Sequence, residues 1–126
     1  AKLGLIPDSG GTWRLPRLVG MQRAKGLARL GPRVSAEQAL AWGMIWQVVE
    51  DEQLMSTALE LAEQMATQPT RGFAFTKQAF AASATNTLDA QLELEKELMR
   101  AAGKTHDYKE GVAAFLAKRA PVYKGE

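Results

Sequence analysis

The sequence of 126 residues contains no cysteine and a single histidine, His106. Disulfide-bonded scaffolds and thiolate metal sites both need cysteine, so these two classes are excluded. A metal site or catalytic triad built on histidine needs more than one imidazole can easily supply. We therefore expect no metal ion and no histidine-centred chemistry in this chain.

Long hydrophobic runs and a strong net charge are also missing. No apolar run approaches the roughly 18–20 residues of a membrane span, and no signal-peptide pattern opens the chain, so a cytoplasmic setting is the default expectation. The 16 Lys and Arg residues against 14 Asp and Glu leave a net charge of +2. Because a charge of +2 spread over this length produces only a weak electrostatic field, neither a nucleic acid nor a membrane is expected as a partner.

The chain does contain enough apolar material for a core. Hydrophobic residues make up 46% of it, and a compact chain of this size buries roughly 65–70% of the surface that its unfolded form exposes. The length predicts one ordinary domain, with no room for two full ones. The sequence begins at Ala1 without Met, which indicates either a processed start or a piece of a longer protein.

Apolar periodicity and capping residues predict a mainly α-helical chain. Ser35 to Gln38 has the pattern of a capping box, Thr70 is placed to cap a helix, and Gly20 is placed to end one. Pro16 fits a helix only in the first turn or at a kink. About seven helices are expected, over approximately residues 13–19, 21–30, 36–42, 51–67, 70–84, 88–102 and 106–118.

One or two short strands are expected beside these helices. Ile45 to Val49 is rich in β-branched and aromatic residues, and Leu3 to Ile6 is typical of a strand end or a loop. A lone strand needs a partner, so its sheet would lie outside this chain. The helix over 88–102 carries apolar residues on two adjacent stripes, which indicates contact with two partners.

Asp8 is the first candidate for chemistry, because it precedes Ser9, Gly10 and Gly11 at a helix start. It can serve as an N-cap carboxylate. Alternatively, it can lie at the mouth of a pocket, where small residues let a substrate approach the backbone closely. A phosphate-loop interpretation of the same run lacks the spacing and the lysine of a Walker motif.

The C-terminal segment is basic, which allows two interpretations. One is a solvated face with favourable charge at the C-terminus of a helix. The other is a phosphate-bearing ligand held by Lys118 or Arg119 beside an apolar platform such as Phe115. His106 lies in a polar stretch at a helix start and is expected to be solvated.

Several motifs, in their order and spacing, resemble one known family. They are the runs 4–12 (GLIPDSGGT), 15–20 (LPRLVG), 42–45 (WGMI) and 108–119 (YKEGVAAFLAKR). Through them the chain resembles the crotonase (enoyl-CoA hydratase/isomerase) superfamily over essentially its whole length. More narrowly, Ile6 to Trp13 with Trp42 to Val49 resembles the isomerases of phenylacetate catabolism, which act on 1,2-epoxyphenylacetyl-CoA.

The resemblance implies roles for five residues. Asp8 matches the position at which isomerase members carry a catalytic Asp that removes and returns a proton next to a thioester enolate. Typical hydratases have Gly there. Gly10 and Gly11 would line the acyl pocket. Phe115 and Lys118 match positions that touch the adenine and phosphate end of coenzyme A, which is part of the substrate, so no separate cofactor is expected.

The resemblance also implies an architecture. Family members are longer, and their N-terminal part is a spiral of β-β-α units that supplies the oxyanion hole. Residues 1–50 would be the end of that core, and 51–126 a helical region for trimerisation and CoA contact, with a trimer or a dimer of trimers in the full-length enzyme. The chain alone would be inactive. An enoyl-CoA hydratase, or a non-catalytic helical oligomerisation module, remains an alternative.

Overall fold

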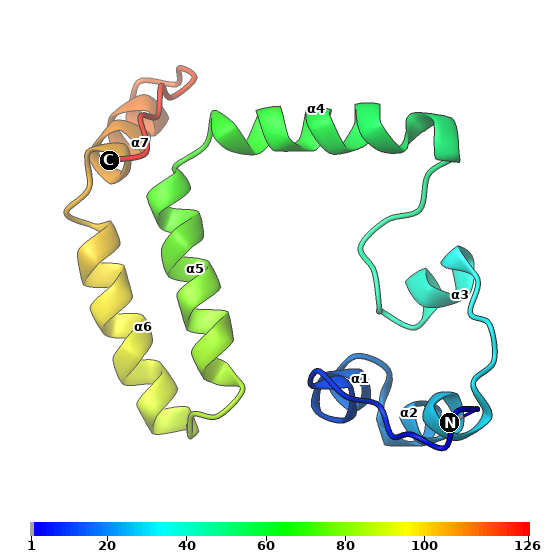
Figure 1. Ribbon diagram of the computed structural model, residues 1–126. Helices are drawn as coiled ribbons and strands as arrows, with labels where there is room; N and C mark the ends of the chain where they lie inside the picture. Colours follow the sequence, from blue (N-terminus) through cyan, green and yellow to red (C-terminus); the bar gives the residue numbers. More distant parts are fainter. Residues whose placement is uncertain (1) are drawn as a thin grey trace. The chain divides into compact units, whose positions relative to one another are not determined.

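The computed structural model describes residues 2–126 of the chain (Figure 1). Helices are the only regular secondary structure in this part of the chain, as the periodicity predicts. In order they are α1 (Gly11–Val19), α2 (Met21–Leu30), α3 (Ala36–Ala41), the short 3-10 helix η1 (Asp51–Gln53), α4 (Leu54–Ala66), α5 (Thr70–Ser83), α6 (Leu88–Ala102) and α7 (His106–Leu116).

The strand predicted over Ile45 to Val49 is wrong. This segment has no regular structure, and Leu3 to Ile6 lies in turns, bends and irregular chain. β-Branched and aromatic residues favour a strand only where a neighbouring strand supplies hydrogen bonds and packing. Among residues 2–126 no such neighbour exists, and the Trp46 side chain is 86% exposed.

The chain forms two compact units, one ending at Leu54 and the other spanning Met55–Glu126. In the first unit, helices α1 and α2 pack against each other. Gly20 lies between them and, with φ 80° and ψ 157°, ends one helix and begins the next. Pro16 lies inside α1, beyond the first turn, where its ring removes one helical N–H donor.

Some of the helix starts follow the predicted capping chemistry. The Ser35 hydroxyl accepts a hydrogen bond from the backbone N–H of Gln38 at 3.2 Å, which confirms the N-cap of the predicted box. Thr87 caps α6 in the same way, through the N–H of Ala90. The prediction for Thr70 is wrong, because this residue is already the first of α5 and Pro69 holds the N-cap position.

In the second unit, α5 and α6 form an antiparallel pair that lies side by side in Figure 1. Gln91 of α6 links the two helices, because its side-chain amide donates to the backbone carbonyl of Ala79 at 3.2 Å. Gln91 also accepts a hydrogen bond from Asn86 in the connecting loop. These contacts fix the turn between the helices.

The expected core is largely missing within the described residues. The buried hydrophobic residues there are Val19, Ala24 and Ala114. Large apolar side chains on α4 and α6 stay exposed, among them Met55 at 67% and Met99 at 74%. The apolar stripes that the sequence predicts are therefore present, but this chain does not cover them itself.

Candidate functional site

Asp8 begins a tight turn that leads into α1. Its backbone carbonyl accepts a hydrogen bond from the N–H of Gly11 at 2.7 Å. The two residues between them, Ser9 and Gly10, both have positive φ, 50° and 82°. Two successive positive φ values define a type I′ turn, which an L-residue such as Ser9 seldom enters. The backbone at Ser9, directly after Asp8, is thus held in a strained conformation.

The N-cap interpretation of Asp8 is wrong. Gly10 holds the N-cap position of α1, and no side chain forms a cap hydrogen bond there. Asp8 itself is exposed. Its backbone carbonyl closes the turn, and its carboxylate is not used to satisfy the first N–H groups of the helix.

A small apolar pocket of about 170 Å³ adjoins this turn. Gly11 lines it together with Pro7, Leu15 and Met21, but Gly10 does not. A Cβ atom built on Gly11 would lie 3.1 Å from the Cβ of Pro7, so even alanine would be crowded. The structure therefore brings Asp8, Gly10 and Gly11 together in one turn and places only Gly11 against a pocket.

The other predicted site residues, Phe115 and Lys118, lie at the C-terminal end of α7. The N–H of Lys118 bonds to the carbonyl of Phe115 at 3.2 Å, and the N–H of Arg119 bonds to that of Ala114 at 3.0 Å. This pair of bonds is a Schellman motif, which usually has glycine at its left-handed position. Here that position is Lys118, with φ 51°. The Phe115 side chain is 83% exposed.

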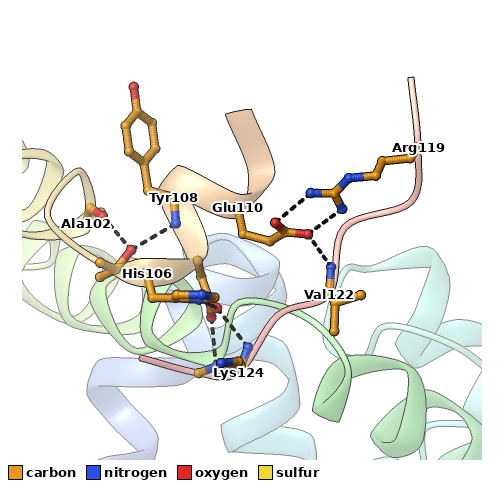
Figure 2. Close-up of polar contacts among 10 residues, drawn as sticks. Ala102, His106, Tyr108, Glu110, Arg119, Val122 and Lys124 are labelled. Atoms are coloured by element: carbon orange, nitrogen blue, oxygen red, sulfur yellow. Dashed lines mark hydrogen bonds and ion pairs between the residues drawn. The ribbon is translucent and has the colours of Figure 1, made fainter. Parts of the chain in front are cut away.

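Arg119 is bound by a carboxylate of the same helix. Its guanidinium donates two hydrogen bonds to Glu110, at 2.6 and 2.8 Å, and Glu110 also accepts from the N–H of Val122 at 2.8 Å (Figure 2). These hydrogen bonds lower the pKa of Glu110 from its ordinary 4.5 to about 2. Of the two predicted phosphate-binding cations, Arg119 is therefore engaged and Lys118 is the one without an ion-pair partner among the described residues.

A second carboxylate, Asp107, binds the end of the returning tail. The N–H groups of Lys124 and Gly125 each donate to it at 2.8 Å, and its own N–H donates to the carbonyl of Glu126. Burial of Asp107 is the largest influence and acts to raise its pKa, but the hydrogen bonds from Lys124 and Gly125 together with the neighbouring His106 outweigh burial, and the pKa is lowered. Residues 119–126 thus run back along α7 from its C-terminus to its N-terminus.

Sequence reasoning missed both of these carboxylates. Asp107 and Glu110 are three positions apart on α7 and so share a face. Acidic residues at this spacing, followed by Arg119 in the segment just after the helix, were the available signal. The basic character of the segment indicated its lysines instead.

An open pocket of about 420 Å³ lies beside α7. Phe115, Val112 and Tyr123 line it, so it is mainly apolar, while Lys118 does not line it. The His106 side chain is 46% exposed, which confirms the prediction that it is solvated. Residues 2–126 hold no group of three acidic or histidine side chains that could bind a metal ion, and no helix among them is long and apolar enough to cross a membrane.

Comparison with known proteins identifies the family. A family model described as enoyl-CoA hydratase/isomerase matches residues 1–126. The chain belongs to the enoyl-CoA hydratase/isomerase family. Among proteins related to it, the 1,2-epoxyphenylacetyl-CoA isomerase of Escherichia coli is 60% identical over the whole chain. A probable enoyl-CoA hydratase of Rhodobacter capsulatus is 44% identical over 98% of the chain.

Solved structures of the enoyl-CoA hydratase/isomerase family have the same fold over this region. A subunit of an enoyl-CoA hydratase from Geobacillus kaustophilus matches 99% of the chain with a TM-score of 0.96 and 35% identity. An enoyl-CoA hydratase from Bacillus anthracis matches the same share with a TM-score of 0.92 and 39% identity. The chain spans about half the length of these relatives, 49% and 48% respectively.

Proposed function

We propose that this chain supplies the catalytic carboxylate and the nucleotide-contact end of a CoA-thioester isomerase. The observation that carries the proposal is the strained turn after Asp8, which holds an exposed carboxylate in the same turn as Gly11, a residue that lines an apolar pocket. Identity of 60% to the Escherichia coli isomerase over all 126 residues supports 1,2-epoxyphenylacetyl-CoA as the substrate.

In this proposal Asp8 acts as a general base and then as a general acid. Its carboxylate removes a proton from the carbon next to the thioester carbonyl, and the electron pair moves onto the carbonyl oxygen to form an enolate. We expect two backbone N–H groups, supplied by another part of the full-length enzyme, to stabilise that oxygen. The electron pair then moves back from the oxygen along the conjugated bonds, and Asp8 returns the proton at a different carbon. For the epoxide substrate, the ring carbon–carbon bond of the epoxide opens to give the expanded ring, so no atom is gained or lost. Gly10 and Gly11 keep the backbone close to the acyl group.

Phe115 and Lys118 are proposed to contact the adenine and phosphate end of coenzyme A. An exposed ring offers a flat apolar surface for a base, and an ammonium offers charge-assisted hydrogen bonds to phosphate. The ring of Phe115 and the ammonium of Lys118 come from residues three positions apart at one helix end. Coenzyme A is part of the substrate here, and the proposal needs no separate cofactor or metal ion.

The substitution Asp8→Asn in the natural full-length protein tests the assignment. It keeps the size of the side chain and removes the base, so turnover of 1,2-epoxyphenylacetyl-CoA should fall about 10²–10⁴-fold. Asp51→Asn is the matched control, because Asp51 is another exposed carboxylate at a helix start of the first unit. Near-normal turnover of the Asp8 variant, with a functional control, would rule out Asp8 as the base.

An enoyl-CoA hydratase is the second candidate, since the Rhodobacter capsulatus relative is named a probable hydratase. Hydration adds water across a double bond that is already conjugated with the thioester, whereas isomerisation moves a proton between carbons. Measuring both reactions on the same preparation separates them. Faster hydration of an enoyl-CoA than isomerisation would favour the second candidate.

A further inference from the structure

The backbone at Lys118 adopts a conformation that its side chain disfavours. At the left-handed position of a Schellman motif, glycine is usual because it has no Cβ to clash with the neighbouring carbonyl. Lys118 has φ 51° and is, with Ser9, one of two non-glycine residues with positive φ in the described part of the chain. Strain of this kind persists only where the surroundings impose it, and it often coincides with function.

The residues that follow Lys118 impose this conformation. Arg119 is held through its backbone N–H on Ala114 and through its guanidinium fork on Glu110. Glu110 takes a third hydrogen bond from Val122, three residues further on. The Glu110 side chain is 16% exposed and the Arg119 side chain 46% exposed, so the carboxylate is partly shielded while the guanidinium stays open to water.

We propose that Glu110 is a positioning residue, which acts through Arg119 to hold Lys118 left-handed and so present its ammonium, beside the Phe115 ring, to the anionic nucleotide end of a CoA thioester. The inference rests on the proposed function for its ligand. The ion pair between Glu110 and Arg119 also leaves the Lys118 ammonium available to a ligand, because the Glu110 oxygens already accept hydrogen bonds from Arg119 and Val122.

A double-mutant cycle in the natural full-length protein tests this role. The probe is free coenzyme A, and its Kd is measured by calorimetry for the wild type, Lys118→Met, Glu110→Gln and the double variant. Lys118→Met should weaken binding about tenfold or more, since it removes a charge-assisted hydrogen bond to phosphate. Glu110→Gln should also weaken binding, although it touches no ligand.

The coupling between the two changes decides the question. If Glu110 positions Lys118, then Lys118→Met should weaken binding much less in the Glu110→Gln background than in the wild type. Fold-losses that simply multiply would overturn the proposal. So would tighter binding in Glu110→Gln, because the freed guanidinium of Arg119 would then be the better phosphate ligand.

Two further variants separate positioning from general stability. Glu93→Gln breaks the exposed ion pair with Lys96 on α6, in the same unit, and should leave the Kd unchanged. Arg119→Lys keeps the charge but loses the two-pronged fork, so it should weaken binding in the direction of Glu110→Gln. A loss of affinity in Glu93→Gln equal to that in Glu110→Gln would indicate a nonspecific effect and would contradict the proposal.

A readout without coenzyme A distinguishes failure of this inference from failure of the proposed function. Amide hydrogen exchange reports on the N–H of Arg119, whose bond to Ala114 defines the left-handed end. Glu110→Gln should accelerate its exchange selectively. Unchanged exchange overturns the positioning role. If exchange is faster in Glu110→Gln but Lys118→Met binds coenzyme A normally, then Glu110 does hold the helix end and only the assignment of coenzyme A as the ligand of Lys118 is overturned.

Discussion

At the scale of single residues, two side chains occupy backbone conformations that glycine adopts more easily. Ser9 supports the turn after Asp8, and Lys118 ends α7. Each lies next to, or is itself, a residue proposed to touch the substrate. Backbone strain is costly, so its presence beside proposed functional residues in each of the two units is consistent with function outweighing local stability.

Replacing Lys118 with glycine should therefore stabilise the protein while weakening coenzyme A binding. Holding an L-residue in the left-handed conformation costs about 1–2 kcal/mol, which glycine would relieve. Glycine also destabilises the folded state by roughly 0.5–1 kcal/mol, because its unfolded chain has more conformational entropy to lose. The expected net gain in the free energy of unfolding, measured with urea, is therefore about 0–1.5 kcal/mol. Lys104→Gly, in a turn without positive φ, is the control and should show no gain. Destabilisation by Lys118→Gly would contradict the strain argument.

At the scale of elements, α7 and its tail depend on two ionised carboxylates. The pKa of Glu110 is lowered to about 2 by Arg119 and the N–H of Val122. Burial acts to raise the pKa of Asp107, yet the N–H groups of Lys124 and Gly125 and the neighbouring His106 together lower it. A carboxylate whose pKa falls on folding stabilises the folded state above its ordinary pKa, and this contribution is lost as pH falls through the folded value.

Acid should therefore release the tail from α7. Glu110 loses its contribution to stability between pH 4.5 and about 2. Over this range the urea midpoint of the wild type should decrease more steeply than that of Glu110→Gln, because the variant has no carboxylate to protonate at this position. Circular dichroism during urea titration at several pH values measures both midpoints. Parallel pH profiles for the two proteins would show that the fork does not contribute to stability.

Some elements could be predicted from sequence because their signals are local. Ser35 and Thr87 cap helices through bonds to residues three positions on, so their neighbourhood suffices. The failed strand over Ile45 to Val49 depended on a partner that the described chain does not contain. Asp107 was missed because its partners lie 17 and 18 residues away, in a tail with no regular structure.

In the candidate site, too, some features could be predicted from the sequence and others required the structure. The family motifs indicated Asp8, Gly10, Gly11, Phe115 and Lys118, and the structure adds the strained turn and the left-handed helix end that hold them. Neither conformation could be inferred from composition, because Ser and Lys seldom adopt positive φ. Residue chemistry alone left Lys118 and Arg119 as alternatives, and the family resemblance indicated Lys118. The structure adds the physical reason, since the Arg119 guanidinium is already bound by Glu110.

At the scale of the whole molecule, the exposed apolar helix faces need a cover. Leu88, Leu92 and Met99 on α6 are 73%, 53% and 74% exposed. An open apolar groove of about 450 Å³ also runs between α5 and α6. Apolar patches of this kind usually mark association surfaces, and we propose that the full-length protein forms a trimer or a dimer of trimers.

Light scattering on the natural full-length protein tests this proposal. Leu88→Gln with Met99→Gln should shift dissociation to at least about tenfold higher concentration, because burial of apolar area drives association. Glu93→Gln with Glu97→Gln, on the same helix, is the control and should leave assembly unchanged. A wild type that stays monomeric at high concentration would exclude an assembly role, and with it the alternative of a non-catalytic oligomerisation module.

The return of the tail along α7 has a consequence for how this region opens. A helix of 11 residues is too short to be stable alone in water, so α7 depends on the hydrogen bonds that the tail donates to Asp107 and Glu110. Detaching the tail and unwinding the helix should then be one cooperative event, a small folding unit of its own. The residues proposed to contact the nucleotide, Phe115 and Lys118, would be formed or lost together with this unit, so a ligand bound to them should protect the same amides that the tail protects.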